Sequence, residues 1–344
     1  MTPDHRPLID ERAALRAASL VAPTRRREPQ DVAALRADVA ADLPAIDAAA
    51  RAWTQLGADL PPTTARVVGR LSWVRANLAT LQDAFEPLRD KLERRSRLAG
   101  NVLGTQLGAL LGLLSSKVLG QFVLPLGRPG GGELLVVGPN VLDLADDHGP
   151  LAADIRRTVV LHEVTHRLQF DGVPWLGDHL RQLLERYLAG ARVDRGALAE
   201  AAARLPEAVA AARRDGDVQP LLKVVLTEEQ AGIVQQAQGL MSLLEGHGNA
   251  AMYEAADPEL IGDGEAVRRA LASRHGDVTS KVLTAVAGME MKRRQYREGE
   301  AFVRAVIEQD GVAGLNRAFE APEHLPDADE VTDPSGWLAR VSPA

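Results

Sequence analysis

The 344-residue chain contains no cysteine, which excludes disulfide bonds, a thiolate nucleophile and a zinc site with cysteine ligands. Aromatic residues make up only 3% of the chain, so its core has to be built from Leu, Val and Ala, mostly on helices. The formal net charge of −7 and the lack of a dense basic cluster argue against a nucleic-acid partner. No apolar segment of a secretory signal is visible near Met1, and we therefore expect a cytoplasmic protein.

The remaining composition is that of an ordinary globular protein, with 46% hydrophobic and 25% charged residues. The length allows one large domain or two smaller ones. In the N-terminal part, apolar residues recur at three- and four-residue steps, as in Leu35, Val39 and Leu43, which is typical of helices. We predict a helical region over residues 1–98 and a second region over 99–344, or one continuous domain.

Three glycines at four-residue spacing, Gly104, Gly108 and Gly112, lie in an apolar run within residues 101–119. A membrane span is one interpretation, but polar residues interrupt the run outside Leu107–Leu114. A span needs about twenty apolar residues. Small residues also let a soluble helix approach a neighbouring helix closely. We therefore favour a buried soluble helix and expect no membrane span.

The pattern then changes to two short apolar runs, Gln121–Leu126 and Glu133–Val137, joined by the glycine-rich segment Arg128–Gly132. Such a pattern predicts a β-hairpin with a flexible loop. A strand beside a catalytic helix can pair with an extended substrate backbone, and two ordinary strands of a small sheet are the plainer alternative. The expected fold class is therefore α+β, predominantly α-helical, with a small sheet or hairpin.

Residues Leu161–Gln169 read L-H-E-V-T-H-R-L-Q and contain His162, Glu163 and His166, an H-E-x-x-H motif. Residues four apart lie on one face of a helix, so the two imidazoles can bind one metal ion, with the Glu beside them. With eight His in the chain, a chance match is expected on the order of once in a hundred such chains. We favour a zinc site over a buried helix whose His satisfy internal hydrogen bonds.

The residues around the motif predict a helix with defined ends. Gly149-Pro150 is a start signal, and Asp171-Gly172 followed by Pro174 is a stop signal. Apolar residues stand at helical spacing between them. Further along, His179 has no supporting motif and is predicted to be a surface or capping residue rather than a ligand.

A catalytic zinc takes three protein ligands and keeps one position open. The best stretch for the third ligand is Met241–Asn249, within a helix that we expect to begin at Thr227. Glu245 and His247 are about 200° apart around a helix, so only one of them faces the metal. We predict Glu245 as the ligand and His247 as a neighbouring donor, because three residues favour burial of the His247 face: Leu240, Leu243 and Leu244. A buried ion-pair role for Glu245 is the alternative.

The same segment contains Gly239, Gly246 and Gly248. Each glycine costs a helix about 1 kcal/mol relative to alanine. Three of them in one helix indicate that another backbone approaches closely, and the metal helix is the expected neighbour.

H-E-x-x-H with a downstream Glu on a second helix resembles the gluzincin branch of the zincin metallopeptidases. Shorter motifs, taken in order along most of the chain, resemble one bacterial family of uncharacterised zinc-dependent metallopeptidases. Some members of that family carry a label that associates them with deazaflavin coenzyme biosynthesis. The resemblance implies a zincin-like core and zinc as cofactor, but no particular substrate. The motifs are Leu119–Phe122, Gly138–Asn140, Gln169–Phe170, Pro174–Leu176, Leu244–His247, Lys292–Tyr296 and Trp337.

We therefore predict a zinc-dependent hydrolase, most specifically a metallopeptidase that acts on a peptide or protein. In this scheme zinc, held by the three ligands, lowers the pKa of its bound water to about 7. Glu163 takes the proton as general base and passes it to the leaving amine. Either His247 or Tyr296, on a helix expected over residues 278–309, then stabilises the oxyanion. The alternatives are a non-catalytic, zinc-stabilised binding protein and an amidase acting on a small molecule.

Overall fold

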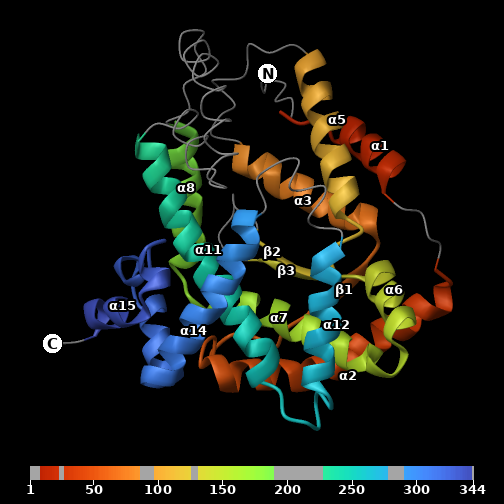
Figure 1. The fold of residues 1–344 in the computed structure, drawn as a ribbon. Helices are drawn as coiled ribbons and strands as arrows, with labels where there is room; N and C mark the ends of the chain where they lie inside the picture. The colour runs from red at the N-terminus through yellow and green to blue at the C-terminus, as the bar shows by residue number, and fades with distance from the viewer. Residues whose placement is uncertain are drawn as a thin grey trace.

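The computed structural model describes residues 8–22, 27–85, 97–124, 131–189, 228–277 and 290–342. Within these ranges, the side chains of 97–99, 228, 272–277 and 290–297 are not described. The predicted fold class is confirmed, since helices dominate these ranges and accompany a small three-stranded sheet (Figure 1).

The strands of the sheet follow the order β1-β3-β2. The pairing of β2 (Gly120–Val123) with β3 (Glu133–Val137) is antiparallel and confirms the predicted hairpin, although residues 125–130 of its loop lie outside the described residues. Strand β1 (Ala65–Val68) runs parallel to β3. The prediction of a helical N-terminal region is wrong here. Four residues reading A-R-V-V are too short to show the alternation of a strand, and their pairing is non-local.

Parts of the chain on both sides of residue 98 share this sheet and one hydrophobic cluster. The cluster contains Leu43 from α2 (Pro29–Thr54), Val136 from β3 and Leu161 from α7 (Ala152–Gly172), all buried. Because neither part buries this cluster alone, we favour a single continuous domain over two separate ones.

Helix α7, which contains the H-E-x-x-H motif, lies between the sheet and α2 (Figure 1). It follows a short 3-10 helix at Gly149–Leu151 and ends at Gly172, as the start and stop signals predict. Apolar side chains such as Leu161 and Leu168 are fully buried along it. The motif is therefore held on a helix that is packed on several sides.

The glycine stripe forms a close contact between α1 (Glu11–Val21) and α5 (Arg97–Leu114), which lie side by side in Figure 1. A Cβ atom at Gly108 would overlap the Ala14 carbonyl, and one at Gly112 would lie 2.7 Å from the Cα atom of Ala18. The predicted close approach of a neighbouring helix is thus confirmed. The prediction of a buried helix holds for the glycine face alone, because Val102 and Leu113 of α5 are exposed. Among the described helices, none combines the length and the apolar character that crossing a membrane requires.

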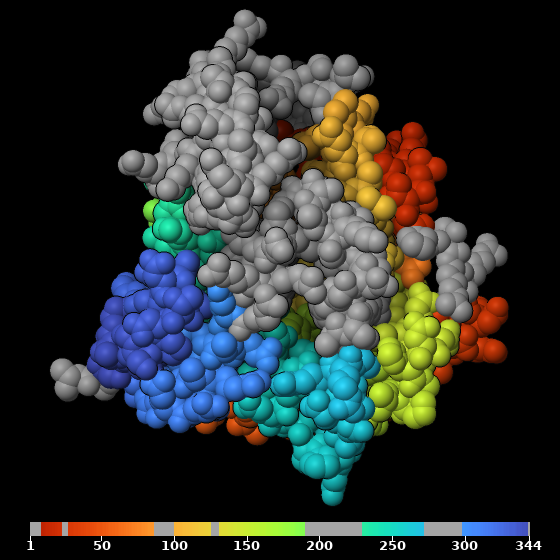
Figure 2. All heavy atoms as spheres, in the orientation of Figure 1, coloured from red at the N-terminus to blue at the C-terminus, as the bar shows by residue number. Residues whose placement is uncertain are grey.

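Both α6 (Gly138–His148) and the C-terminal part pack on α7. Helix α11 (Glu228–Glu254) packs on α7 and on α14 (Glu290–Asn316), and α15 (Pro334–Val341) packs on α14. Figure 2 shows α14 and α15 in blue as one continuous area of the surface. Trp337 is fully buried and donates from Nε1 to the His324 carbonyl at 2.8 Å, so it anchors the C-terminal segment on the body of the protein.

The remaining elements of the described ranges complete the fold: α3 (Arg70–Phe85), α8 (Leu176–Ala189), α12 (Gly264–Asp277) and the 3-10 helices Arg317–Phe319, Pro322–His324 and Glu330–Thr332.

Candidate metal centre

The three predicted metal ligands lie together in the structure. The Nε2 atoms of His162 and His166 on α7 are 3.0 Å apart. Glu245, from α11, places Oε2 at 3.6 Å from the first and 3.9 Å from the second of these nitrogens. One donor atom of each side chain lies within 4.8 Å of the others. Two helices far apart in the sequence thus direct three donor atoms at one point.

This donor set fits a zinc ion. Tetrahedral zinc with bonds of about 2.0–2.2 Å requires ligand atoms to be roughly 3.3–3.6 Å apart. The distances of 3.0, 3.6 and 3.9 Å bracket that range. Two imidazoles and one carboxylate are a ligand set of catalytic zinc sites, which leaves a fourth position open. The three side chains keep between 14% and 22% of their surface exposed, so the cluster is reached from solvent.

Gly248 allows α11 to approach the His162 ring. A Cβ atom at this position would lie 2.8 Å from Cε1 and 2.9 Å from Nδ1 of His162. The expectation that glycines of α11 face the metal helix is therefore confirmed for Gly248. It is wrong for Gly239, which faces the Pro326 carbonyl, and for Gly246, which faces the backbone of α14.

We expect Gly248→Ala to lower zinc affinity by about 10- to 100-fold, the range found when a group that orients a ligand is altered. The reason is that the added methyl group forces the His162 ring out of its present position. A competition titration with a chromophoric chelator measures the change.

Gly232→Ala on the same helix is the matched control, because nothing lies within 4 Å of its added Cβ. It should leave zinc affinity unchanged and stabilise the helix by about 0.5–1 kcal/mol. Equal affinities of the two variants would contradict this account.

Glu163 lies beside the three ligands, but its carboxyl group is hydrogen-bonded to strand β2. Its Oε2 accepts a hydrogen bond of 2.8 Å from the Phe122 N–H of strand β2. A Cβ atom at Gly120 would lie 2.7 Å from its Cγ, so the strand packs tightly on the side chain. Burial raises the pKa of Glu163 to about 7; Glu245 adds to the rise, and His166 and the Phe122 N–H oppose it. Near neutral pH this carboxyl can accept and release a proton.

The contact also bears on the expected pairing of β2 with a substrate backbone. The Val137 N–H donates to the Leu119 carbonyl, and in this register the Phe122 N–H points away from β3. Since Glu163 accepts from it, this backbone donor of β2 is not free to pair with a substrate.

His247 does not join the ligand cluster. Its side chain is fully buried, and its ring lies 5.2 Å from the Trp53 ring and 5.5 Å from the Phe319 ring. Its Nδ1 lies 2.9 Å from Nε2 of Gln169. Burial, with a smaller effect of His166, lowers the pKa of His247 to about 3, so the ring is neutral. The predicted oxyanion-donor role has no support in this placement, because a ring enclosed by two aromatic rings does not face a substrate.

Tyr296 lies in the N-terminal part of α14, and its side chain is outside the described part of the structure. Its role as an oxyanion donor stays a prediction.

Two residues near the site were not predicted, Trp53 and Gln169. Gln169 stands one helical turn after His166, so its position on the same face was visible in the sequence. Nothing in the sequence links Trp53 to the site.

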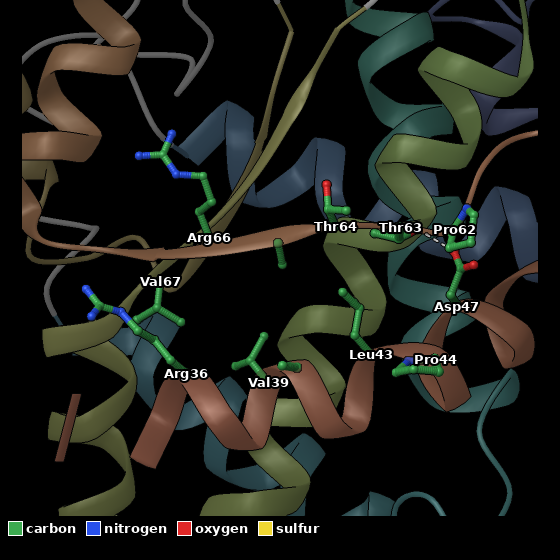
Figure 3. Close-up of a pocket in the computed structure, with 12 residues that line it drawn as sticks. Arg36, Val39, Leu43, Pro44, Asp47, Pro62, Thr63, Thr64, Arg66 and Val67 are labelled. Carbon is green, nitrogen blue, oxygen red and sulfur yellow. Dashed lines mark hydrogen bonds between the residues drawn. The ribbon is translucent and has the colours of Figure 1, made fainter. Parts of the chain in front are cut away.

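A separate pocket of about 630 Å³ lies between α2 and the segment that leads into β1 (Figure 3). Its lining includes Val39, Leu43 and Arg66, and none of the predicted site residues. At one end Asp47 accepts from Thr63 and pairs with arginines, among them Arg51 of α2 at 2.9 Å. These polar groups already satisfy one another, and we assign the pocket no part in the chemistry.

The chain belongs to the zincin-like metallopeptidase family, whose family model matches residues 9–338. The predicted resemblance is thereby confirmed over nearly the whole chain. A crystal structure from Chloroflexus aurantiacus, provisionally described as a hydrolase with a novel fold, is similar to this one with a TM-score of 0.70 and 27% identity. The similarity covers 96% of this chain and 98% of the other. No curated protein matches the chain. The association with deazaflavin coenzyme biosynthesis stays a prediction.

Proposed function

We propose that the protein is a zinc-dependent metallopeptidase of the gluzincin type. The observation that carries the proposal is the convergence of His162, His166 and Glu245, with Glu163 held beside them. Membership of the zincin-like metallopeptidase family supports hydrolysis and implies a metal, and the similarity to a structure described as a hydrolase agrees with it.

Each residue of the site has a distinct role in this proposal. His162 and His166 would hold the metal through Nε2 and Glu245 through Oε2, because these are the atoms that face one another. When bound, zinc supplies a Lewis acid and lowers the pKa of a coordinated water to about 7. Glu163 acts as general base and then as general acid towards the leaving amine. Burial raises its pKa to about 7 in the metal-free chain. The Phe122 N–H keeps its carboxylate oriented.

We propose a peptide or protein as the substrate, in the cytoplasm. The name of the family supports a peptide, and strand β2 packs against α7 next to the cluster. The Phe122 N–H is engaged by Glu163, so a substrate backbone would have to use other groups of this strand.

The zinc-loaded chain should cleave an unstructured polypeptide, lose this activity when a chelator removes the metal, and regain it on addition of zinc. Incubation with a broad peptide library, with products identified by mass spectrometry, measures the activity and its preference. Cleavage that survives complete removal of the metal would exclude a zinc-dependent mechanism. Absence of cleavage by the loaded chain would favour a non-catalytic binding protein, or an amidase if small amides are hydrolysed instead.

A further inference from the structure

Gln169 connects the metal helix to α11 through its side-chain amide. It is fully buried and stands one turn after His166 on α7. Its Oε1 lies 2.8 Å from Nδ1 of His166. Its Nε2 lies 3.1 Å from the Leu244 carbonyl and 2.9 Å from Nδ1 of His247. All polar atoms of this amide therefore have partners on two helices.

The Leu244 carbonyl determines which way the amide faces. A carbonyl oxygen only accepts hydrogen bonds, so the NH2 group of Gln169 has to face it. The amide oxygen then faces Nδ1 of His166, and that nitrogen has to carry the proton of the bond. In the neutral ring, Nε2 of His166 is then the unprotonated nitrogen, and it faces Glu245 and His162.

His247 completes the arrangement from the other side. The second N–H of the Gln169 amide points at Nδ1 of His247, which accepts it as an unprotonated nitrogen. Trp53 and Phe319 hold this ring by stacking. The same turn of α11 that carries Glu245 therefore also carries the two groups that orient the amide, the Leu244 carbonyl and the His247 ring.

We propose that Gln169 is a positioning residue that fixes the tautomer and the orientation of His166 for metal binding, and that Leu244 and His247 lock Gln169 in place. This inference rests on the proposed function, because it deepens the account of the same metal centre. In this proposal the buried imidazole of His247 holds Gln169 in place and is not an oxyanion donor in the reaction.

His162, the other histidine of the motif, has no side chain that fixes its tautomer among the described residues. Nδ1 of His162 is buried and has no hydrogen-bond partner among the described residues. It lies beside the space that Gly248 leaves open on α11. The two ligands therefore differ, and His166 is the one whose lone pair is directed before the metal arrives.

Nitrogen-15 NMR of the metal-free chain tests the tautomer directly. In the wild type, Nδ1 of His166 should carry a slowly exchanging proton, and Nε2 should have the shift of an unprotonated nitrogen. In Gln169→Leu, which keeps the size of the side chain but removes the amide, part of the population should move to the Nε2–H tautomer. A neutral His166 ring that carries its proton on Nε2 in the wild type overturns the proposal without any variant having to fold.

Zinc affinity provides the second measurement. Gln169→Leu should lower it by about 10- to 100-fold, the usual cost of losing a group that orients a ligand. His247→Phe keeps a ring between Trp53 and Phe319 and leaves the Leu244 bond, so its loss should be under about tenfold. Thr158→Val is the matched control, since it removes a buried hydroxyl of α7 whose one hydrogen bond within the described residues goes to the Asp154 carbonyl. It should leave the affinity unchanged.

The outcomes separate this inference from the proposed function. A shifted tautomer and weakened zinc binding in Gln169→Leu support it even when the wild type cleaves no peptide. Weakened binding with an unchanged tautomer overturns it, because the loss then comes from general damage to packing. An equal loss in Thr158→Val overturns it for the same reason.

Discussion

The double variant His162→Ala/His166→Ala is expected to hold no zinc after dialysis, whereas the wild type should hold about one ion per chain. The variant keeps only Glu245 of the cluster, and a single partly exposed carboxylate does not retain zinc at neutral pH. Metal analysis of dialysed protein by mass spectrometry measures the content. Circular dichroism shows whether the variant remains folded.

His179→Ala is the matched control for this experiment. This histidine lies on α8 with its ring 5.8 Å from that of Trp175, and it is not part of the cluster. Its replacement should leave the zinc content at the wild-type value. Stoichiometric zinc in the double variant would rule out the site, and loss of zinc in the control would point to a second one.

The same measurement separates Glu245 from His247 as third ligand. Glu245→Ala removes a proposed ligand and should weaken zinc binding more than His247→Phe, which removes only a contact to Gln169. The opposite order would mean that His247 reaches the metal and that the proposed site is wrong.

The parts of the site that the sequence predicts are those set by local geometry. His162 and His166 are four residues apart, so any regular helix brings them together, and the glycine and proline signals place the ends of α7 correctly. The choice of Glu245 rests on the same kind of reasoning, because the leucines of α11 leave only one face for the cluster.

The features of the fold and the site that the sequence does not predict depend on contacts between segments that are distant along the chain. Strand β1 exists because it pairs with β3, and its four residues carry little pattern of their own. The partner of Gly246 is Gly299 on α14, although the metal helix is equally plausible from the spacing alone. The contact of Trp53 with His247 likewise arises only when α2 and α11 are packed together.

Glu163→Gln is expected to lower peptide turnover by about 10²–10⁴-fold, the usual contribution of a general base. The amide has the size of the carboxyl group, and its oxygen can still accept the hydrogen bond from the Phe122 N–H. It cannot take a proton from water. The variant should therefore keep its fold and its zinc, because Glu163 is not one of the three clustered donors. Initial rates on one cleaved peptide, with zinc content measured on the same sample, provide the comparison.

The geometry of Glu163 also explains why this substitution is more informative than Glu163→Ala. Removal of the side chain would leave the Phe122 N–H without a partner and open a space beside Gly120, so lost activity could reflect a displaced strand β2. The glutamine variant avoids both effects. Equal turnover by variant and wild type would show either that another group is the base or that a contaminating protease cleaves the peptide. The double variant His162→Ala/His166→Ala, treated with a chelator so that it holds no metal, distinguishes these two explanations. If it too cleaves at the wild-type rate, the activity does not belong to this chain.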